Sequence, residues 1–262
     1  MISLLSGINS SYIVENPFPH VVVKDVLPVD IYNGISSSFP SFSQIGWGDG
    51  RVLPRSNTRF QLSAAMIEMN PDIAQVLKDF VGYHSSPAFF AEVVELFRDY
   101  WPEALKHDLG GTLLGHQMGR IIQDTPRPGL ILQDARVEIN TPVTGPASSS
   151  RWAHLDTANR LFTCLLYLRH PDDDAIGGDL QLFRWKNSIS ADPFAFAQSE
   201  NDVEVVATIP YCANQMVIFP QTLHSLHGVS VRQPTAHTRR YMFISAELDH
   251  DWLAVPAQVA AE

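Results

Sequence analysis

The sequence has few cysteines, few basic residues and no long apolar run. Cys164 and Cys212 are its only cysteines, too few for a disulfide framework of the kind found in small secreted proteins. The 28 Asp and Glu residues outnumber the 18 Lys and Arg residues, and the net charge of −10 argues against nucleic acid or an anionic membrane as the main partner. No apolar stretch reaches the roughly 18 residues that a membrane-spanning helix needs. The first residues also lack the basic and apolar regions of a signal peptide, so we expect a cytoplasmic protein.

The composition is that of a globular protein, because 45% of the 262 residues are hydrophobic. We expect a single domain over residues 1–262, with a mixed helical and strand layer at 1–129 supporting a β core at 130–250. The clearest helix is predicted at 87–101, where apolar residues recur at steps of three and four. From residue 130 onward, β-rich runs alternate with turn signals, as in a barrel or sandwich. The fold class is therefore predicted to be mainly β with flanking helices (α+β).

The most informative motif is His154-Leu155-Asp156. Two residues apart on an extended strand, the histidine and aspartate side chains point to the same face. A second histidine follows after the apolar strand 215–219, and either His227 or His224 can occupy that position. Two histidines and one carboxylate on one face of a metal form the facial triad of non-haem Fe(II) oxygenases. The pattern thus predicts an iron site, with either His227, which Gly228 and Val229 follow, or His224 as the third ligand.

The order of the motifs resembles that of the 2-oxoglutarate and Fe(II)-dependent dioxygenases, in the branch related to prolyl hydroxylases. After the His-x-Asp pair come an apolar strand ending in Tyr-Leu, an acidic turn, Gly-Gly-x-Leu, an apolar strand ending in Phe-Pro, the second histidine and an arginine. In this chain these are residues 165–168, 172–174, 177–180, 217–220, His227 and Arg240. The resemblance is specific over residues 150–245.

This resemblance implies a double-stranded β-helix, the jelly-roll core of cupin-like proteins. It implies Fe(II) held by His154, Asp156 and His227, with 2-oxoglutarate and O2 as co-substrates. An arginine in the last strand would pair with the distal carboxylate of 2-oxoglutarate, because its planar fork stays charged when buried. Arg239 and Arg240 are both candidates, and strand alternation lets only one of them face the interior. The family pattern favours Arg240, which would leave Arg239 at a solvated strand edge.

Five further residues are candidates for binding substrate. Arg136 and Glu138 belong to a polar face of the strand 134–140, which is either a cavity wall or simply a solvent-facing side. Arg151 and Trp152 directly precede the first metal ligand and are placed to close the site. His224 is the fifth candidate, as a residue that holds a ligand or substrate by a hydrogen bond.

The resemblance implies oxidative decarboxylation of 2-oxoglutarate to succinate and CO2, coupled to hydroxylation of an unactivated C–H bond. Related halogenases carry Gly or Ala in place of the carboxylate, so Asp156 disfavours halogenation. A compact domain favours a small metabolite or amino-acid-like substrate, and nothing in the sequence indicates an oligomeric state. Two other functions remain open, a cupin-like metal-dependent hydrolase or isomerase and a non-catalytic ligand-binding barrel.

Overall fold

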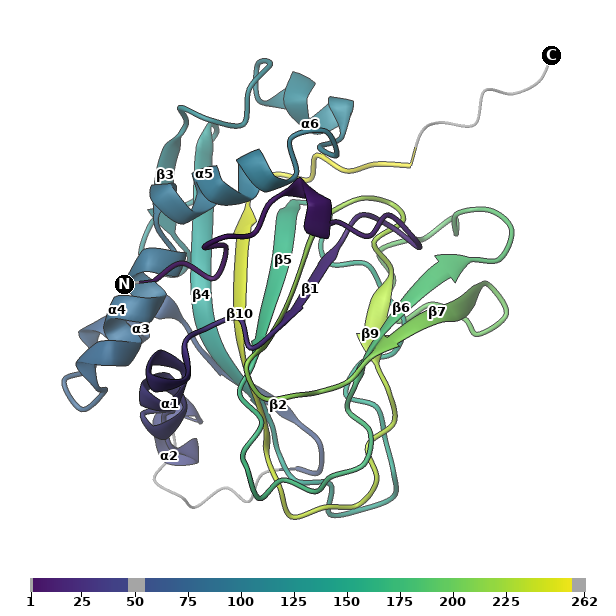
Figure 1. Ribbon diagram of the computed structural model, residues 1–262. Helices are drawn as coiled ribbons and strands as arrows, with labels where there is room; N and C mark the ends of the chain where they lie inside the picture. The colour runs from purple at the N-terminus through teal and green to yellow at the C-terminus, as the bar shows by residue number, and fades with distance from the viewer. Residues whose placement is uncertain (1, 47–54, 256–262) are drawn as a thin grey trace.

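Two β-sheets face each other, and helices cover the outer side of the larger one (Figure 1). The computed structural model describes residues 2–46 and 55–255 of the chain. Within them the large sheet has seven strands and the small sheet has three. This arrangement confirms the predicted mainly β fold with a jelly-roll core and flanking helices.

The large sheet combines strands from both halves of the sequence. Its order is β1 (Val21–Lys24), β8 (Gln215–Pro220), β5 (Arg160–Tyr167), β10 (Arg239–Glu247), β4 (Leu130–Asn140) and β2 (Arg59–Leu62), with β3 (Gln117–Arg120) beside β4. All neighbours are antiparallel except β3 and β4. The N-terminal region therefore supplies two edge strands of this sheet, β1 and β2, as well as helices.

The small sheet lies opposite the large one and consists of β7 (Val203–Ile209), β6 (Leu180–Trp185) and β9 (His227–Val229), in that order. Between the two sheets lies a core rich in aromatic residues, which includes Phe18, Tyr167, Leu182 and Phe219. Because side chains alternate along a strand, every strand of the large sheet turns one set of residues toward this space and the other toward the helices.

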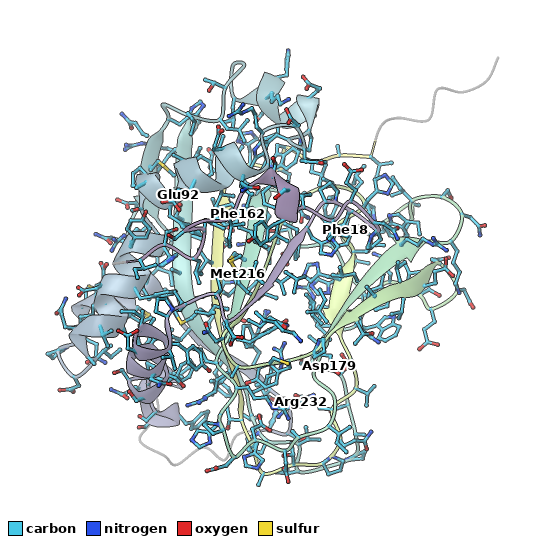
Figure 2. The ribbon with its side chains drawn as sticks, viewed as in Figure 1. Phe18, Glu92, Phe162, Asp179, Met216 and Arg232 are labelled. Carbon is cyan, nitrogen blue, oxygen red and sulfur yellow. The ribbon has the colours of Figure 1, made fainter. Side chains whose placement is uncertain are left out.

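In the described part of the chain, six helices accompany the sheets, together with a 3-10 turn at Ser10–Tyr12. The helices are α1 (Val29–Ser37), α2 (Phe42–Ile45), α3 (Ala64–Met69), α4 (Gln75–His84), α5 (Pro87–Leu96) and α6 (Glu103–Asp108). Their apolar residues and the outward side chains of the large sheet form one continuous core. Figure 2 shows Phe162 and Met216 of this core, and Phe18 on the side of the small sheet. Among the described residues, no helix combines the length and the apolar character required to cross a membrane.

Helix α5 is shorter than its periodicity predicts. It begins where Ser86 caps the first turn and Pro87 takes the first helical position, where proline is favoured. It ends at Leu96 instead of continuing to Trp101. Trp101 precedes Pro102, and a residue before proline disfavours the helical conformation. The indole of Trp101 stays buried and donates a hydrogen bond of 3.0 Å to the carbonyl of Val94.

Candidate metal centre

The three predicted metal ligands lie together between the two sheets. His154 and His227 form an antiparallel bridge in which each backbone N–H donates to the other residue's carbonyl, at 2.9 and 3.0 Å. His154 Nε2 is 3.9 Å from Asp156 Oδ1, and His227 Nε2 is 3.8 Å from Asp156 Oδ2. All three ligand atoms lie within 4.8 Å of one another. This donor set fits the facial triad that holds Fe(II) and leaves the opposite positions of the metal open.

Backbone carbonyls orient both imidazoles. His154 Nδ1 donates to the carbonyl of Trp152 at 2.7 Å, and His227 Nδ1 donates to that of Ser225 at 3.0 Å. These bonds place the proton on Nδ1 and leave Nε2 as the free ligand atom, as is usual for histidines that bind metals. Burial lowers the pKa of both histidines. Both rings are therefore neutral near pH 7, the form that metal binding requires.

Asp156 is ionised although it is buried. Burial alone would raise its pKa, but its electrostatic interactions with the His227 ring and with the Arg160 guanidinium lower it below its usual range. The Thr163 hydroxyl donates to Oδ2 at 2.5 Å and favours the charged form further. The side-chain amide of Gln221 donates to the Asp156 carbonyl at 3.1 Å and fixes the backbone of this ligand.

Gly228 allows the two ligand-bearing segments to meet. A Cβ atom at this position would lie 2.8 Å from the backbone nitrogen of Ala153 and 2.8 Å from the carbonyl carbon of Trp152. Because Gly228 has no side chain, β9 can lie close to the backbone of the segment that carries His154. His224, the alternative ligand, has an exposed side chain and lies outside the cluster. It does not line the cavity described below either, and its contact with substrate stays a prediction.

The triad forms part of the wall of a cavity of about 330 Å³. The buried side of this wall includes Arg239 and Tyr241 of β10, together with Leu165 and Leu180. Arg59, Arg151 and Phe196 also line it and are more accessible to solvent, so they mark its mouth. The metal ligands therefore share one cavity with a deep arginine and with cations near the surface.

Arg239 is the deep arginine, with 2% of its surface exposed. Its Nε donates to the carbonyl of Gly178 at 2.8 Å, and its guanidinium lies 4.6 to 5.1 Å from the ring centroids of Tyr167, Tyr211 and Tyr241. The Tyr167 hydroxyl has no hydrogen-bond partner within the described residues. A buried cation beside an unpaired hydroxyl is suited to a carboxylate ligand.

The prediction that Arg240 faces the interior is wrong. Arg240 points to the opposite face of β10, where its Nε donates to the carbonyl of Leu168 at 3.1 Å and its guanidinium lies 5.2 Å from the centre of the Phe39 ring. Arg239, Tyr241 and Phe243 alternate with it and all line the cavity. The two arginines thus have the opposite orientations to those expected from the family pattern.

Residues 146–245 match the family model described as the 2OG-Fe(II) oxygenase superfamily, and this segment contains the triad and Arg239. This part of the chain is similar to that superfamily. The similarity implies Fe(II) as the metal and 2-oxoglutarate and O2 as co-substrates, and the donors just described fit the first two. None of the curated proteins compared with the chain matches it.

Solved structures that resemble the chain include hydroxylases and an epimerase. A prolyl-4-hydroxylase from Pseudomonas putida is 14% identical, with a TM-score of 0.45, over 87% of this chain and 92% of that one. A prolyl hydroxylase from Trichoplax adhaerens, in complex with a hypoxia inducible factor peptide fragment, is 14% identical, with a TM-score of 0.47, over 93% and 89%. The epimerase SnoN, in complex with Fe3+, alpha ketoglutarate and nogalamycin RO, is 12% identical, with a TM-score of 0.48, over 87% and 78%.

The polar face of β4 is turned toward the space between the two sheets, so its alternative interpretation as a solvent-facing side is wrong. Glu138 is completely buried and lines the cavity. Arg136 donates from Nε to Glu138 Oε1 at 2.6 Å, and its Nη1 lies 3.5 Å from Asp134 Oδ2. The Arg136 guanidinium also covers the ring of Phe243, 4.2 Å from its centroid. This paired charge network supports the cavity wall.

Arg151 and Trp152 have different surroundings. Arg151 lines the cavity, and its guanidinium lies 5.3 Å from the centre of the Phe196 ring. The Trp152 ring packs edge-on against Phe183, with centroids 5.1 Å apart, and does not line the cavity. The contact of the Trp152 side chain with substrate therefore stays a prediction that the cavity lining does not support. Its carbonyl instead orients His154.

Sequence reasoning missed several residues that build the site. Arg59 and Phe196 reach the cavity from β2 and from the loop between β6 and β7. Tyr241 and Phe243 follow from the alternation of β10 once Arg239 is known to face inward. Arg160 contributes a buried positive charge that lowers the pKa of Asp156. The first two carried no sequence signal, because distant segments bring them to the site.

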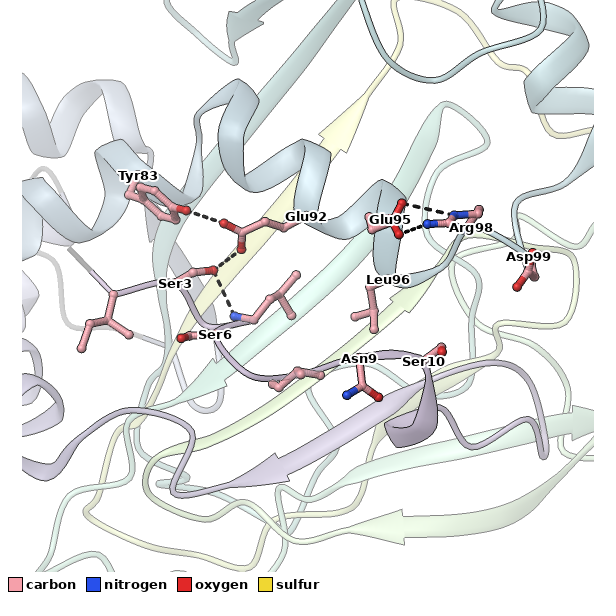
Figure 3. A pocket seen from close by; sticks show the side chains of 13 residues that line it. Ser3, Ser6, Asn9, Ser10, Tyr83, Glu92, Glu95, Leu96, Arg98 and Asp99 are labelled. Atoms are coloured by element: carbon pink, nitrogen blue, oxygen red, sulfur yellow. Dashed lines mark hydrogen bonds and ion pairs between the residues drawn. The ribbon is translucent and has the colours of Figure 1, made fainter.

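A second and larger cavity, of about 630 Å³, lies on the helical side between the N-terminal segment and α5 (Figure 3). In it, Glu92 accepts hydrogen bonds from the hydroxyl groups of Ser3 and Tyr83. The carboxylates that line it are Glu92, Glu95 and Asp99. This cavity contains no member of the triad, so the oxygenase chemistry belongs to the smaller one.

Proposed function

We propose that this chain is a 2-oxoglutarate-dependent hydroxylase of a small molecule. The observation that carries the proposal is one cavity that holds a complete facial triad and a buried arginine. His154, Asp156 and His227 are the residues that would hold Fe(II). Arg239 would pair with the distal carboxylate of 2-oxoglutarate, since it is the deepest cation in the wall.

Bound Fe(II) would supply the oxidising chemistry with 2-oxoglutarate and O2 as co-substrates: one oxygen atom of O2 would enter succinate as 2-oxoglutarate loses CO2, and the other would hydroxylate a C–H bond of the substrate. The protein positions and shields the reactants. Leu165 and Leu180 give the cavity apolar walls that exclude water. Thr163 keeps one oxygen of Asp156 engaged and so restricts the orientation of this carboxylate.

Two features favour hydroxylation of a small molecule. Asp156 keeps the carboxylate that related halogenases lack, so no ligand position is left free for a halide. The cavity volume of about 330 Å³ is near the lower end of the roughly 300–1,000 Å³ typical of small-ligand sites. Part of this volume would be taken by 2-oxoglutarate, which leaves room for only a small group of the substrate.

The proposal predicts that the purified protein binds Fe(II) and forms succinate from 2-oxoglutarate with consumption of O2. His154→Ala should reduce succinate formation by more than about 100-fold, because changing even a residue that supports a metal ligand costs about 10- to 100-fold. Metal content measured on the same samples should fall in parallel. His224→Ala is the matched control, since this histidine is exposed and should leave both readouts unchanged.

A folded protein that binds a metal but neither binds 2-oxoglutarate nor forms succinate would contradict the proposal. That result would favour a metal-dependent hydrolase or isomerase that uses the same three ligands. A protein that binds neither metal nor 2-oxoglutarate would favour a non-catalytic barrel.

A further inference from the structure

Two arginines stand at the mouth of the cavity. Arg151 comes from the segment before the triad, and Arg59 begins β2 in the N-terminal half of the chain. Their side chains are 24% and 49% exposed, in contrast to the fully enclosed Arg239. Two independent segments therefore place cations at the opening, in a protein with a net charge of −10.

The carboxylates near the mouth are already engaged. Glu138 pairs with Arg136 at 2.6 Å, and its second oxygen is 3.9 Å from Arg59 Nη1. Within residues 2–46 and 55–255, the only carboxylate within 4.0 Å of the Arg151 guanidinium is that of Asp156, at 4.0 Å. Asp156 is a metal ligand, so a bound divalent cation would share its negative charge. Arg151 is then a cation without a dedicated counter-charge.

An aromatic wall adjoins this cation. Phe196 lines the cavity with 74% of its surface exposed, and its carbonyl accepts a hydrogen bond of 3.4 Å from Arg151 Nε. Phe243 lies further inside, on the same strand face as Arg239. A molecule entering the cavity would thus meet a positive charge at the rim and apolar surface beside it.

We propose that the substrate is a small organic carboxylate, with its anionic group paired to Arg151 and Arg59 and its hydrocarbon part against Phe196 and Phe243. This inference rests on the proposed function, because it assumes that Arg239 and the metal are occupied by 2-oxoglutarate. The guanidinium of Arg151 offers the planar fork that matches a carboxylate. The small cavity limits the part of the substrate that enters to a few carbon atoms beyond that group.

The test uses matched acids and amides on a protein that cannot turn over. The full chain is loaded with Zn(II), its binding of 2-oxoglutarate is measured by calorimetry, and the saturated complex is then titrated with hexanoate, phenylacetate and 4-phenylbutyrate and with the primary amide of each. We expect at least one acid to bind about tenfold more tightly than its amide, the difference that one hydrogen-bonded charge at a partly exposed site supplies. Added salt should reduce this preference.

Three variants separate the contributions of Arg151, Arg59 and Phe196 to substrate binding. Arg151→Gln should remove most of the acid preference while 2-oxoglutarate binding persists, and Arg59→Gln should remove a smaller part. Phe196→Ala should weaken an acid and its amide equally. Arg184→Gln is the matched control, because this exposed arginine pairs with Glu204 on the small sheet at 2.5 Å and should leave binding unchanged.

Two results would overturn the inference. One is a preference below about twofold for all three acids, including a panel in which nothing binds, since this is less than half a kcal/mol. The other is an acid preference that survives Arg151→Gln. Failure of the first titration, in which 2-oxoglutarate itself does not bind, would instead overturn the proposed function and this inference with it.

Discussion

The two faces of the large sheet have opposite chemistry, although the same strands build both. On β4 the side chains turned toward the helices are apolar except for Gln133, and Ile131, Ala135, Val137 and Ile139 belong to the helical core. The opposite face of this strand begins with Leu130 and Leu132 and is polar from residue 134 onward, with Asp134, Arg136, Glu138 and Asn140. On β10, Met242 and Ile244 likewise belong to the helical core, whereas Arg239 and Tyr241 line the cavity.

The two faces contribute differently to the stability of the fold and to the binding of ligands. The outer face gains free energy from burial of apolar area, which is non-directional and accepts many side chains of similar volume. The inner face depends on particular partners, because a buried charge without its pair is costly. Substitutions on the outer face should therefore change the free energy of unfolding, and substitutions on the inner face should change ligand binding.

The largest expected effect on stability is at Phe162, on the outer face. Its ring, labelled in Figure 2, is completely buried. The rings of Phe89 and Phe90 of α5 lie at centroid distances of 6.4 Å from it. Phe162→Ala should lower the free energy of unfolding by about 3–5 kcal/mol, the usual cost of such a cavity. Chemical denaturation measures this loss. Affinity for 2-oxoglutarate, measured on the folded protein, should not change.

Phe196→Ala is the matched substitution at the mouth of the cavity. This ring is 74% exposed, so its removal should change the free energy of unfolding by less than about 0.5 kcal/mol. Equal losses of stability in the two variants would contradict the expectation that the helical core, and not the mouth of the cavity, determines the free energy of unfolding.

The second prediction compares two adjacent arginines on opposite faces of β10. Arg239→Gln should weaken 2-oxoglutarate binding by about 10- to 100-fold, because a charge-assisted pair with a carboxylate contributes about 1.5–3 kcal/mol. Arg240→Gln should leave this affinity unchanged, since its guanidinium lies against Phe39 on the helical side. Calorimetry on the Zn(II)-loaded protein measures both constants. The opposite ranking would show that Arg240 holds the co-substrate.

Much of the architecture was predictable because it depends on local periodicity. The strands from residue 130 onward and the apolar face of the 87–101 helix follow from the spacing of apolar side chains. The pair His154 and Asp156 was predictable for the same reason, because residues two apart on an extended segment share a face. His227 required the order of motifs as well.

The choice between Arg239 and Arg240 was not predictable in this way. Residues 230–238 join β9 to β10 without forming a regular strand, so the alternation at His227 cannot be counted across them. Arg59 and Phe196 depend on tertiary contacts between segments far apart in the chain. Gly228 was noted beside the ligand, but its packing against the backbone of 152–153 is visible only in three dimensions.

The smallest predicted effect concerns a titratable group on the otherwise apolar helical side. His84 of α4 is completely buried; its Nε2 accepts from the Leu4 N–H at 3.1 Å and its Nδ1 donates to the Phe80 carbonyl at 2.8 Å. Burial lowers its pKa to about 3, so the folded state keeps this ring neutral where the unfolded chain protonates it. As the pH falls below about 6.5 the unfolded state takes up the additional proton, and stability decreases.

The buried ring of His84 therefore makes the stability of the helical side depend on pH. The free energy of unfolding should fall by up to about 1.4 kcal/mol per pH unit from His84 alone between its unfolded and folded pKa values. In His84→Gln the slope measured by denaturation between pH 6 and pH 4 should be smaller by about 1 kcal/mol per unit. The imidazoles of the triad are present in both proteins, so the difference in slope isolates this one group. Identical slopes would mean that His84 takes up its proton without opening the helical core.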